Sequence, residues 1–313
     1  MQASGSSMNT SAVSNGKNIL LTGASGLIGS ALCGALEAAG YKVYPLARNQ
    51  STAPFSYSEE TCRVQLNSDI PLFAVINLAG PNISDGRWTT ARKKYLLHSR
   101  INLTQALASG IAELPVKPDI FLSASAIGYY GLTGENTVDE NSAAGTDFLA
   151  EIGTRWEQST RPAELAGINT LHLRFGVVLS ASGGMLKKLL LPFKLGLGGK
   201  IGNGRQYLSW ISVEDVQQIV LHLLQTNPPA GAINLVAEEP VTNQEFSQQL
   251  GHALNRPAVL PMPAPVAKLL FGEMGETLLL GSSRVKSIKH DSLGITLRHP
   301  TIDKALQDIL KKN

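Results

Sequence analysis

The chain has 313 residues, which fits one large α/β domain or such a domain with a smaller lobe. Its 43 % hydrophobic and 16 % charged residues indicate a globular core, and a net charge of +3 without a dense basic block argues against a nucleic-acid partner. Only two cysteines are present and no apolar run reaches the roughly 18 residues of a membrane helix, so we expect free thiols in the cytoplasm and no membrane.

Residues 1–16 are rich in Ser, Asn and Gly, and we expect them to form a flexible tail. From Lys17 onward, short apolar segments alternate with helical ones. Strands are predicted over residues 18–22, 41–47, 73–80, 119–125 and 169–179, and helices over 27–39, 89–112 and 147–166. Strands that are apolar on both faces and alternate with helices predict a Rossmann-type, doubly wound parallel sheet, an α/β fold.

After Leu179 the pattern changes to a glycine-rich stretch. Residues 206–237 contain a helix and a last strand that we expect to rejoin the sheet. The predicted organisation is therefore a Rossmann domain over 17–179 that includes 206–237, with a smaller, mostly helical C-terminal substrate lobe over 180–205 and 238–313. Such a lobe would form one wall of a cleft at the carboxyl ends of the strands.

The loop after the first strand reads Gly23-x-x-Gly26-x-x-Gly29. Glycine allows positive φ and close approach of the backbone to a phosphate. The helix that follows directs free N–H groups and the positive end of its dipole at the loop. Because the glycines follow a strand and open a helix, the context predicts a dinucleotide site rather than a plain turn.

The end of the second strand distinguishes NAD from NADP. NAD sites usually carry an acidic residue there for the ribose 2′-hydroxyl, whereas NADP sites use an arginine. Here the segment reads Leu46-Ala47-Arg48-Asn49, and no acidic residue occurs between Glu37 and Glu59. The planar fork of Arg48 suits a 2′-phosphate, which predicts NADP(H) as the cofactor, unless Arg48 is only a solvated strand end.

The motifs TGASGLIG, NLAG, SASAIGYYG, the pair Trp156-Glu157, LRFGVVL and GNGRQYLSWISVEDV resemble, in this order, those of extended short-chain dehydrogenases/reductases. The chain is most similar to their atypical, NAD(P)-dependent epimerase-like branch, whose members are often labelled "cell division inhibitor". The resemblance covers roughly residues 17 to 310. It implies a nucleotide-binding Rossmann fold and an oxidoreductase or epimerase-like activity of the NAD-dependent epimerase/dehydratase type.

The resemblance assigns cofactor-binding roles to three groups of residues. The pyrophosphate loop comprises Gly23, Ser25, Gly26, Leu27, Ile28 and Gly29. Arg48 takes the 2′-phosphate position. Leu78, Ala79 and Gly80 lie along the adenosine. The resemblance also places Arg100 on a helix that faces the cofactor and Val177 near the nicotinamide. The alternatives are that Arg100 is exposed to solvent and that Val177 only packs in the core.

Typical members use a serine with a Tyr-x-x-x-Lys pair, in which a nearby ammonium helps the tyrosine to transfer a proton. No tyrosine of this chain has a lysine four residues further on. The resemblance leaves Ser125 at the position that polarises the substrate carbonyl. Tyr129 and Tyr130 are the candidate proton donors, with Arg155 or solvent as helper, unless both tyrosines belong to a structural loop.

Three residues in the segment that lines the substrate pocket of extended members are candidate substrate contacts, Arg205, Gln206 and Trp210. With Lys187 and Lys188 nearby, that pocket could accept an anion, although both lysines also fit the wet face of a helix. The acidic loop with Glu135, Asp139 and Glu140 could supply a base or simply be solvated. The histidines are scattered without metal-ligand spacing, so we expect no metal.

Two functions remain open from the sequence. The first is an NADP(H)-dependent oxidoreductase or epimerase-like enzyme acting on an unidentified small molecule. The second is a non-catalytic NADPH-binding sensor or regulatory protein, which the missing Tyr–Lys pair favours. A sugar-nucleotide epimerase would need tightly held NAD⁺, against which Arg48 argues. The sequence leaves the substrate and the oligomeric state open, with a homodimer as one arrangement.

Overall fold

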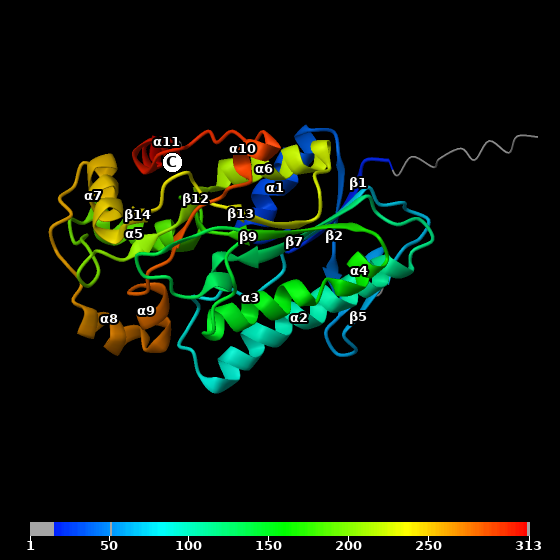
Figure 1. Ribbon diagram of the computed structural model, residues 1–313, viewed down its shortest axis with the longest axis horizontal. Coiled ribbons are helices and arrows are strands. Elements are labelled where there is room, and N and C mark those ends of the chain that lie inside the picture. The colour runs from blue at the N-terminus through cyan, green and yellow to red at the C-terminus, as the bar shows by residue number, and fades with distance from the viewer. Residues whose placement is uncertain (1–15, 51, 312–313) are drawn as a thin grey trace, which may run out of the picture.

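The structure, a computed structural model, describes residues 16–50 and 52–311, so the predicted tail lies almost wholly outside it. Six parallel strands form a central sheet in the order β13-β9-β7-β6-β1-β2 (Figure 1). They are β1 (Asn18–Thr22), β2 (Lys42–Pro45), β6 (Ala74–Asn77), β7 (Ile120–Ala126), β9 (Asn169–Phe175) and β13 (Gly231–Leu235). The Rossmann-type α/β fold predicted from the apolar strands is confirmed.

Helices cover both faces of this sheet, as Figure 1 shows. On one face lie α1 (Leu27–Ala38) and α6 (Val213–Thr226), and on the other α2 (Thr90–Glu113), α3 (Phe148–Gln158) and α4 (Arg161–Leu165). The larger core packs the sheet against α1 and α6 on one face and against α3 and the start of α2 on the other, and it continues into the C-terminal region through Phe193, Phe246 and Leu306. A second core separates the sheet from α2 and α4. In the described part of the chain, no helix is both long and apolar enough to cross a bilayer.

Two predicted elements are interrupted, each for a local reason. The helix predicted over 147–166 breaks between α3 and α4, where the hydroxyls of Ser159 and Thr160 donate to the carbonyls of Trp156 and Glu157 at 2.5 and 2.7 Å. The strand predicted over 169–179 ends at Gly176, where an added methyl group would lie 2.8 Å from the carbonyl oxygen of Ser209. Beyond this close approach, β10 (Val177–Leu179) leaves the main sheet and pairs with β12 (Trp210–Ser212).

A small three-stranded sheet was not predicted. After Pro45 the chain continues as β3 (Ala47–Arg48), which pairs with β4 (Phe55–Ser58) rather than extending the central sheet. β4 in turn pairs antiparallel with β5 (Arg63–Leu66). This hairpin places Glu59 beside the end of β3, where its carboxylate lies close to Arg48.

The C-terminal helices gather beyond the carboxyl ends of the strands, at the left of Figure 1. This group comprises α5 (Gly184–Lys194), α7 (Asn243–Leu254), α8 (Ala264–Phe271), α9 (Glu273–Leu278) and α11 (Ile302–Lys311). By contrast α10 (His290–Leu293) lies beside α6, where a ring nitrogen of His222 is 2.7 Å from the Leu293 carbonyl. Short elements complete the fold, namely η1 (Ile127–Tyr130), β8 (Thr137–Val138), β11 (Tyr207–Leu208), β14 (Val241–Thr242) and β15 (Arg284–Val285).

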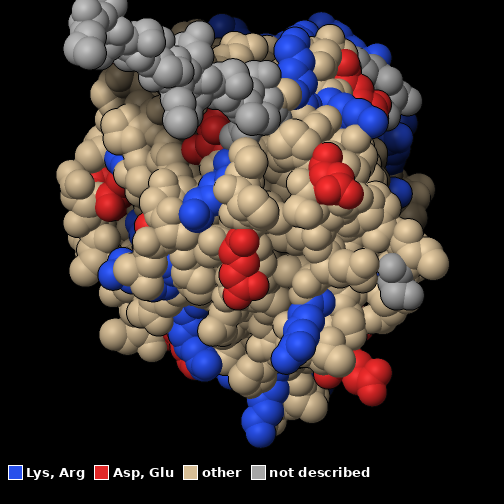
Figure 2. Space-filling model, turned by 90° about the vertical axis from the view of Figure 1, so that its right-hand side faces the viewer, with Lys and Arg blue, Asp and Glu red and all other residues tan. Residues whose placement is uncertain are grey.

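The opposite end of the molecule, at the right of Figure 1, carries charges of both signs. Figure 2 shows lysine and arginine side chains interspersed with aspartate and glutamate on this face. The groups that could serve chemistry lie at the other end of the sheet, where β1, β6 and β7 terminate.

Candidate functional site

The glycine loop between β1 and α1 is folded tightly upon itself. Gly23 has a φ of +68°, which L side chains rarely adopt, and an added methyl group there would lie 3.0 Å from the carbonyl of Leu78. A methyl group added to Gly29 would lie 2.1 Å from the Gly23 carbonyl oxygen. Side chains at these two positions would therefore displace the loop that they define.

This loop is suited to an anion. The helix α1 begins at Leu27 with Gly26 as its N-cap, without a side-chain cap and without an acidic residue in its first turn. Backbone N–H groups and the positive end of the helix dipole thus lie at the start of α1 without a side-chain cap. Ser25 and Gly26 are exposed on the loop, whereas Leu27 and Ile28 are half-buried. The pyrophosphate of a dinucleotide fits such a cradle.

A buried chain of hydrogen bonds holds the neighbouring strand end against this loop. The Thr22 hydroxyl donates to Asn77 Oδ1 at 2.7 Å and accepts the backbone N–H groups of Leu78 and Ala79, each at 3.0 Å. Asn77 Nδ2 donates in turn to Thr104 Oγ1 on α2 at 2.8 Å. The segment predicted to line the adenosine side therefore lies directly beside the glycine loop, in a fixed position.

Arg48 stands at the end of β3 with 68 % of its side chain exposed. Its guanidinium Nη1 lies 3.6 Å from Glu59 Oε1, on the chain that leaves β4. An acidic residue is therefore near the predicted 2′-phosphate position after all, although it pairs with Arg48 instead of replacing it. The exposed guanidinium remains within reach of a ligand at the end of the strand.

Arg100 approaches the segment from Leu78 to Gly80 from the protein interior. It is 8 % exposed, and its guanidinium donates to the carbonyls of Leu96 and Pro81 at 2.9 and 2.7 Å. Its guanidinium carbon lies 5.0 Å from the ring centroid of Trp156 and would be 3.2 Å from a methyl group on Gly80. Burial, with a smaller contribution from Arg92, lowers the pKa of Arg100 to about 10, so it remains a cation near neutral pH. Arg100 is therefore buried, not a solvated helix residue.

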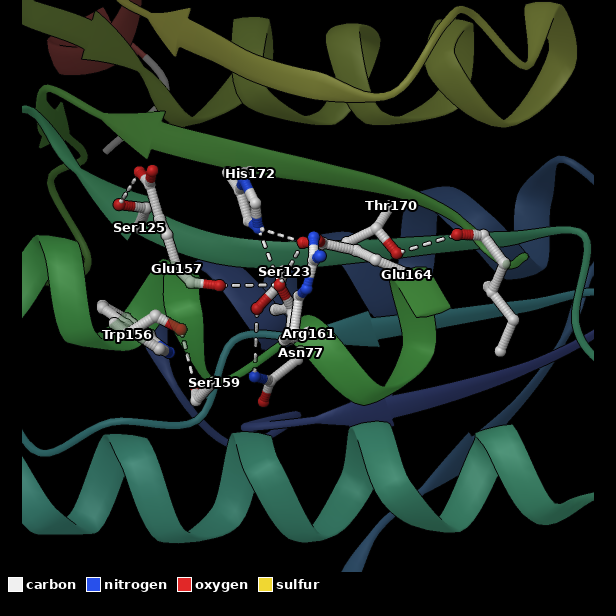
Figure 3. Close-up of polar contacts among 12 residues, drawn as sticks. Asn77, Ser123, Ser125, Trp156, Glu157, Ser159, Arg161, Glu164, Thr170 and His172 are labelled. Atoms are coloured by element: carbon white, nitrogen blue, oxygen red, sulfur yellow. Dashed lines mark hydrogen bonds and ion pairs between the residues drawn. The ribbon is translucent and has the colours of Figure 1, made fainter. Parts of the chain in front are cut away.

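At the end of β7, three polar side chains from different elements meet (Figure 3 shows two of them, Ser125 and Glu157). The Ser125 hydroxyl donates to Glu157 Oε1 at 2.7 Å. Arg174, on β9, donates from Nε to Glu157 Oε1 and from Nη2 to Oε2, both at 2.8 Å. Arg174 is 4 % exposed and Ser125 2 %, so this is a buried, doubly hydrogen-bonded ion pair that also takes up the serine hydrogen.

The two candidate tyrosines differ in their surroundings. The Tyr130 hydroxyl is buried, donates to Asn234 Oδ1 at 2.8 Å and accepts from Arg174 Nη1 at 2.8 Å. Burial outweighs Arg174 and raises the pKa of Tyr130. Tyr129 is half-buried, and the guanidinium carbon of Arg174 lies 3.5 Å from its ring centroid. For the Tyr129 hydroxyl, by contrast, no hydrogen-bond partner is found among the described residues.

The cation beside the tyrosines is not the one expected from the sequence. Arg155 pairs with Glu151, one turn away on α3, at 3.3 Å, and 45 % of its side chain is exposed. The prediction that Arg155 assists the tyrosines is therefore wrong, because the guanidinium that contacts them belongs to Arg174. The acidic loop is also structural in part, since Glu140 accepts the backbone N–H groups of Asn234 and Ile288.

The residues predicted to contact substrate do not form one cluster of free side chains. Arg205 is exposed, whereas Gln206 Nε2 donates to the carbonyls of Ile201 and Leu279 at 3.0 and 2.9 Å. Trp210 is fully buried, so the prediction that its side chain lines a pocket is wrong and it belongs to the core. Lys188 contacts Asp85 at 3.4 Å instead of standing free, and Val177 is half-buried on β10.

Comparisons with known proteins agree with this geometry. Residues 19–235 match the family described as the NAD dependent epimerase/dehydratase family, and residues 262–309 match a domain of unknown function, DUF1731. The chain belongs to the NAD dependent epimerase/dehydratase family. The resemblance inferred from the sequence motifs is thereby confirmed.

Among the relatives of this family member is epimerase family protein Mb2239 from Mycobacterium bovis, which is 40 % identical over 92 % of this chain and 96 % of its own length. The Homo sapiens epimerase family protein SDR39U1 is 36 % identical over 93 % of this chain and 99 % of its own length. A crystal structure of human SDR39U1 (isoform2) with NADPH superposes with a TM-score of 0.88 at 33 % identity, covering 95 % of this chain and all of that one.

Sequence reasoning identified Glu157 only as part of the family motif Trp156-Glu157 and gave neither Glu157 nor Arg174 a role in the site. One signal was available, because Arg174 is a charged residue within the apolar strand LHLRFGVVL, and a buried charge requires a partner. The identity of that partner depends on the packing of α3 against β7 and β9, which no local pattern contains.

Proposed function

We propose that this protein is an NADP(H)-dependent oxidoreductase or epimerase-like enzyme acting on a small molecule. The observation that carries the proposal is the glycine cradle at the start of α1, in which a methyl group on Gly29 would overlap the Gly23 carbonyl. The exposed fork of Arg48 at the next strand end favours NADP(H) over NAD(H). A relative that covers nearly the whole chain has been crystallised with NADPH, which supports the same cofactor here.

In this proposal each part of the cofactor has protein groups to hold it. The loop from Gly23 to Gly29 binds the pyrophosphate, and Arg48 binds the 2′-phosphate. The segment from Leu78 to Gly80 lies along the adenosine, and Arg100 supports that rim from behind through the Pro81 carbonyl. Val177 lies near the nicotinamide. When bound, the cofactor supplies or accepts a hydride at its nicotinamide ring.

Tyr129 is our candidate for transferring the proton that accompanies hydride transfer. The hydroxyl hydrogens of Ser125 and Tyr130 are already donated to Glu157 and Asn234, so neither is free for a substrate. The guanidinium of Arg174 lies over the Tyr129 ring, with its carbon 3.5 Å from the ring centroid, and is the cation beside the proposed proton donor. Arg174 would then replace the lysine that typical relatives place near their tyrosine.

The cofactor part is tested by titrating the purified protein with NADPH and with NADH. In Arg48→Gln the dissociation constant for NADPH should rise roughly tenfold or more, since a hydrogen bond to a charged group contributes about 1.5–3 kcal/mol. NADH affinity should not change. Arg63→Gln, at an exposed position of the same small sheet, is the matched control. Equal NADPH affinity in wild type and Arg48→Gln would contradict the assignment.

A non-catalytic NADPH sensor is the second candidate. It is favoured by the same two committed hydroxyls and by the absence of a Tyr-x-x-x-Lys sequence. The two candidates separate when the protein is incubated with NADPH and a library of carbonyl compounds while absorbance is followed. Turnover that Tyr129→Phe abolishes and Tyr130→Phe reduces less supports the enzyme, whereas tight NADPH binding without turnover supports the sensor. NAD⁺ retained through purification would instead indicate a sugar-nucleotide epimerase.

A further inference from the structure

We propose that the C-terminal lobe binds the surface of a lipid bilayer that contains anionic headgroups. The contact surface, the apolar patch, consists of five large apolar residues that the fold leaves more than half exposed: Leu191, Leu195, Leu197, Val259 and Leu260. The inference stands apart from the cofactor and from the proposed function. It departs from the expectation of no membrane, which rested on the lack of a spanning segment, because a peripheral contact needs no such segment.

Hydrogen bonds join the two chain segments of the apolar patch. The segment that follows α5 lies beside the segment that links α7 to α8, and the latter runs along the left edge of the molecule in Figure 1. The N–H of Leu260 donates across this contact to the carbonyl of Gly198 at 3.1 Å. Leu191 and the C-cap residue Leu195 are four residues apart on α5, so they project from the same side of the helix. The patch is therefore one continuous surface at the end of the lobe.

The backbone beneath the apolar patch can lie against a medium that offers few hydrogen bonds. The N–H groups of Leu195 and Leu197 donate to the carbonyls of Leu191 and Pro192 at 3.1 and 2.9 Å. The segment around Val259 contains residues without an N–H, the prolines at positions 257, 261, 263 and 265. Unsatisfied N–H groups are costly where hydrocarbon replaces water. This part of the chain therefore exposes apolar side chains over a backbone whose donors are largely paired or missing.

The surroundings of the apolar patch are cationic. Neither residues 165–213 nor residues 246–272, which together contain the patch, include an aspartate or a glutamate. Three exposed cations lie next to the patch in the chain: Lys187, Lys194 and Arg256. A further lysine of α5, Lys188, is paired with Asp85 at 3.4 Å and contributes less. Exposed apolar side chains flanked by lysine and arginine are typical of surfaces that enter the interface of an anionic membrane.

The same charges argue against a second copy of the chain as the occupant. In a two-fold dimer the patch of one copy would meet the same patch of the other. The cations of both copies would then approach one another, without an acidic residue in either segment to pair with them, and such like-charge contacts are unfavourable. An anionic bilayer supplies negative headgroups and an apolar interior in one surface, so it matches both properties of the patch.

Cosedimentation of the full chain with lipid vesicles tests the proposal. One set of vesicles contains phosphatidylcholine alone, and the other contains equal parts of phosphatidylcholine and phosphatidylglycerol. Three cations that each contribute about fivefold predict that wild type binds the anionic vesicles roughly a hundredfold more tightly than the neutral ones. Raising the salt concentration from about 0.1 M to about 1 M shortens the Debye length from about 10 Å to about 3 Å and should reduce this difference.

Two double variants separate the apolar and the electrostatic contributions. Leu191→Ser/Leu195→Ser should weaken binding to anionic vesicles by roughly tenfold or more, because burial of a leucine side chain is typically worth at least that much. Lys187→Gln/Lys194→Gln should weaken binding to anionic vesicles by roughly twentyfold and leave binding to neutral vesicles unchanged. All four side chains are exposed, so both variants should keep the wild-type thermal midpoint.

The chain offers a matched control for each variant outside the lobe. Leu165→Ser, on α4, removes a leucine that is 72 % exposed, and Lys42→Gln, on β2, removes an exposed lysine. Both should bind anionic vesicles as tightly as wild type. Val259→Trp provides an independent measurement, because its fluorescence should shift to shorter wavelength on anionic vesicles if this residue enters the interface. The three native tryptophans are at most 7 % exposed, and wild type gives their background.

Wild type that binds neither kind of vesicle would overturn the inference. So would equal binding of wild type and Leu191→Ser/Leu195→Ser to anionic vesicles, or an equal loss in Leu165→Ser. A wild-type dimer in sedimentation velocity that Leu191→Ser/Leu195→Ser dissociates would assign the apolar patch to a second copy and overturn it as well. Should the serine variant fail to fold, Val259→Trp decides alone, and an unshifted emission on anionic vesicles would refute the proposal.

Discussion

Replacing Gly29 by alanine should separate cofactor binding from folding. The added methyl carbon would lie 2.1 Å from the Gly23 carbonyl oxygen and 2.9 Å from the Ala24 Cα, closer than the 3.0 Å that real Cβ atoms respect. The loop or the helix must therefore move by nearly 1 Å. Losing one backbone hydrogen bond to the charged pyrophosphate costs about 1.5–3 kcal/mol, so we expect NADPH affinity to fall roughly tenfold to a hundredfold. Overpacking should lower the free energy of unfolding by about 1–3 kcal/mol.

The same helix supplies a matched control in Gly34, where an added methyl group meets no heavy atom within 4 Å. Gly34→Ala should raise the free energy of unfolding by up to about 1 kcal/mol, because alanine is the better helix former. Its NADPH affinity should equal that of wild type. Fluorescence titration with NADPH and thermal unfolding measure both quantities. Wild-type NADPH affinity in Gly29→Ala would refute the assignment of the loop.

Three further outcomes follow from buried groups. Arg174→Met leaves the buried Glu157 carboxylate unpaired and should lower the free energy of unfolding by about 3–5 kcal/mol. The control Arg161→Met removes one partner of a largely exposed ion pair and should change the free energy of unfolding by less than about 1 kcal/mol. Both values are measured by urea unfolding, and similar losses in the two variants would contradict this prediction. Tyr130→Phe should destabilise by about 1–3 kcal/mol in the same assay and Tyr129→Phe by less, because only the Tyr130 hydroxyl is buried and twice hydrogen-bonded. Burial lowers the pKa of His290 below its ordinary 6.5, so the unfolded chain binds the proton first and the stability of the fold should decrease as the pH falls below about 6.5. Thermal melts at several pH values should show a smaller decrease for His290→Gln than for wild type. An equal decrease in both would exclude His290 as a source of the pH dependence.

Much of the fold could be predicted because its determinants are local. Runs such as NILLT and AVIN contain three consecutive apolar residues, which marks strands buried on both faces. The glycine loop was predictable for the same reason, since its three glycines lie within seven residues. The break at Gly176 and the hairpin of β4 and β5 were not predicted, because both depend on the approach of distant backbone.

The end of the candidate site around Ser125 was only partly predictable. Ser125 and both tyrosines were identified, yet the groups that decide their hydrogen bonds were not. Glu157 is 32 residues from Ser125 and 17 from Arg174, and the three meet only because α3 packs beside β7 and β9. Trp210 was misassigned, since an aromatic residue in a pocket-lining segment cannot be told from a core residue by its neighbours in the chain.

If Arg48 binds the 2′-phosphate as proposed, its pairing with Glu59 makes the binding of NADP(H) an exchange of one anion for another. A phosphate that binds this guanidinium competes with the Glu59 carboxylate, whose Oε1 lies 3.6 Å from Arg48 Nη1. The favourable free energy of phosphate binding is therefore the difference between the two ion pairs and not the full attraction of one. At physiological ionic strength both contacts, being exposed, are screened over about 8 Å. In the proposed function, the β4–β5 hairpin that carries Glu59 would therefore weaken the preference of Arg48 for a phosphorylated ribose.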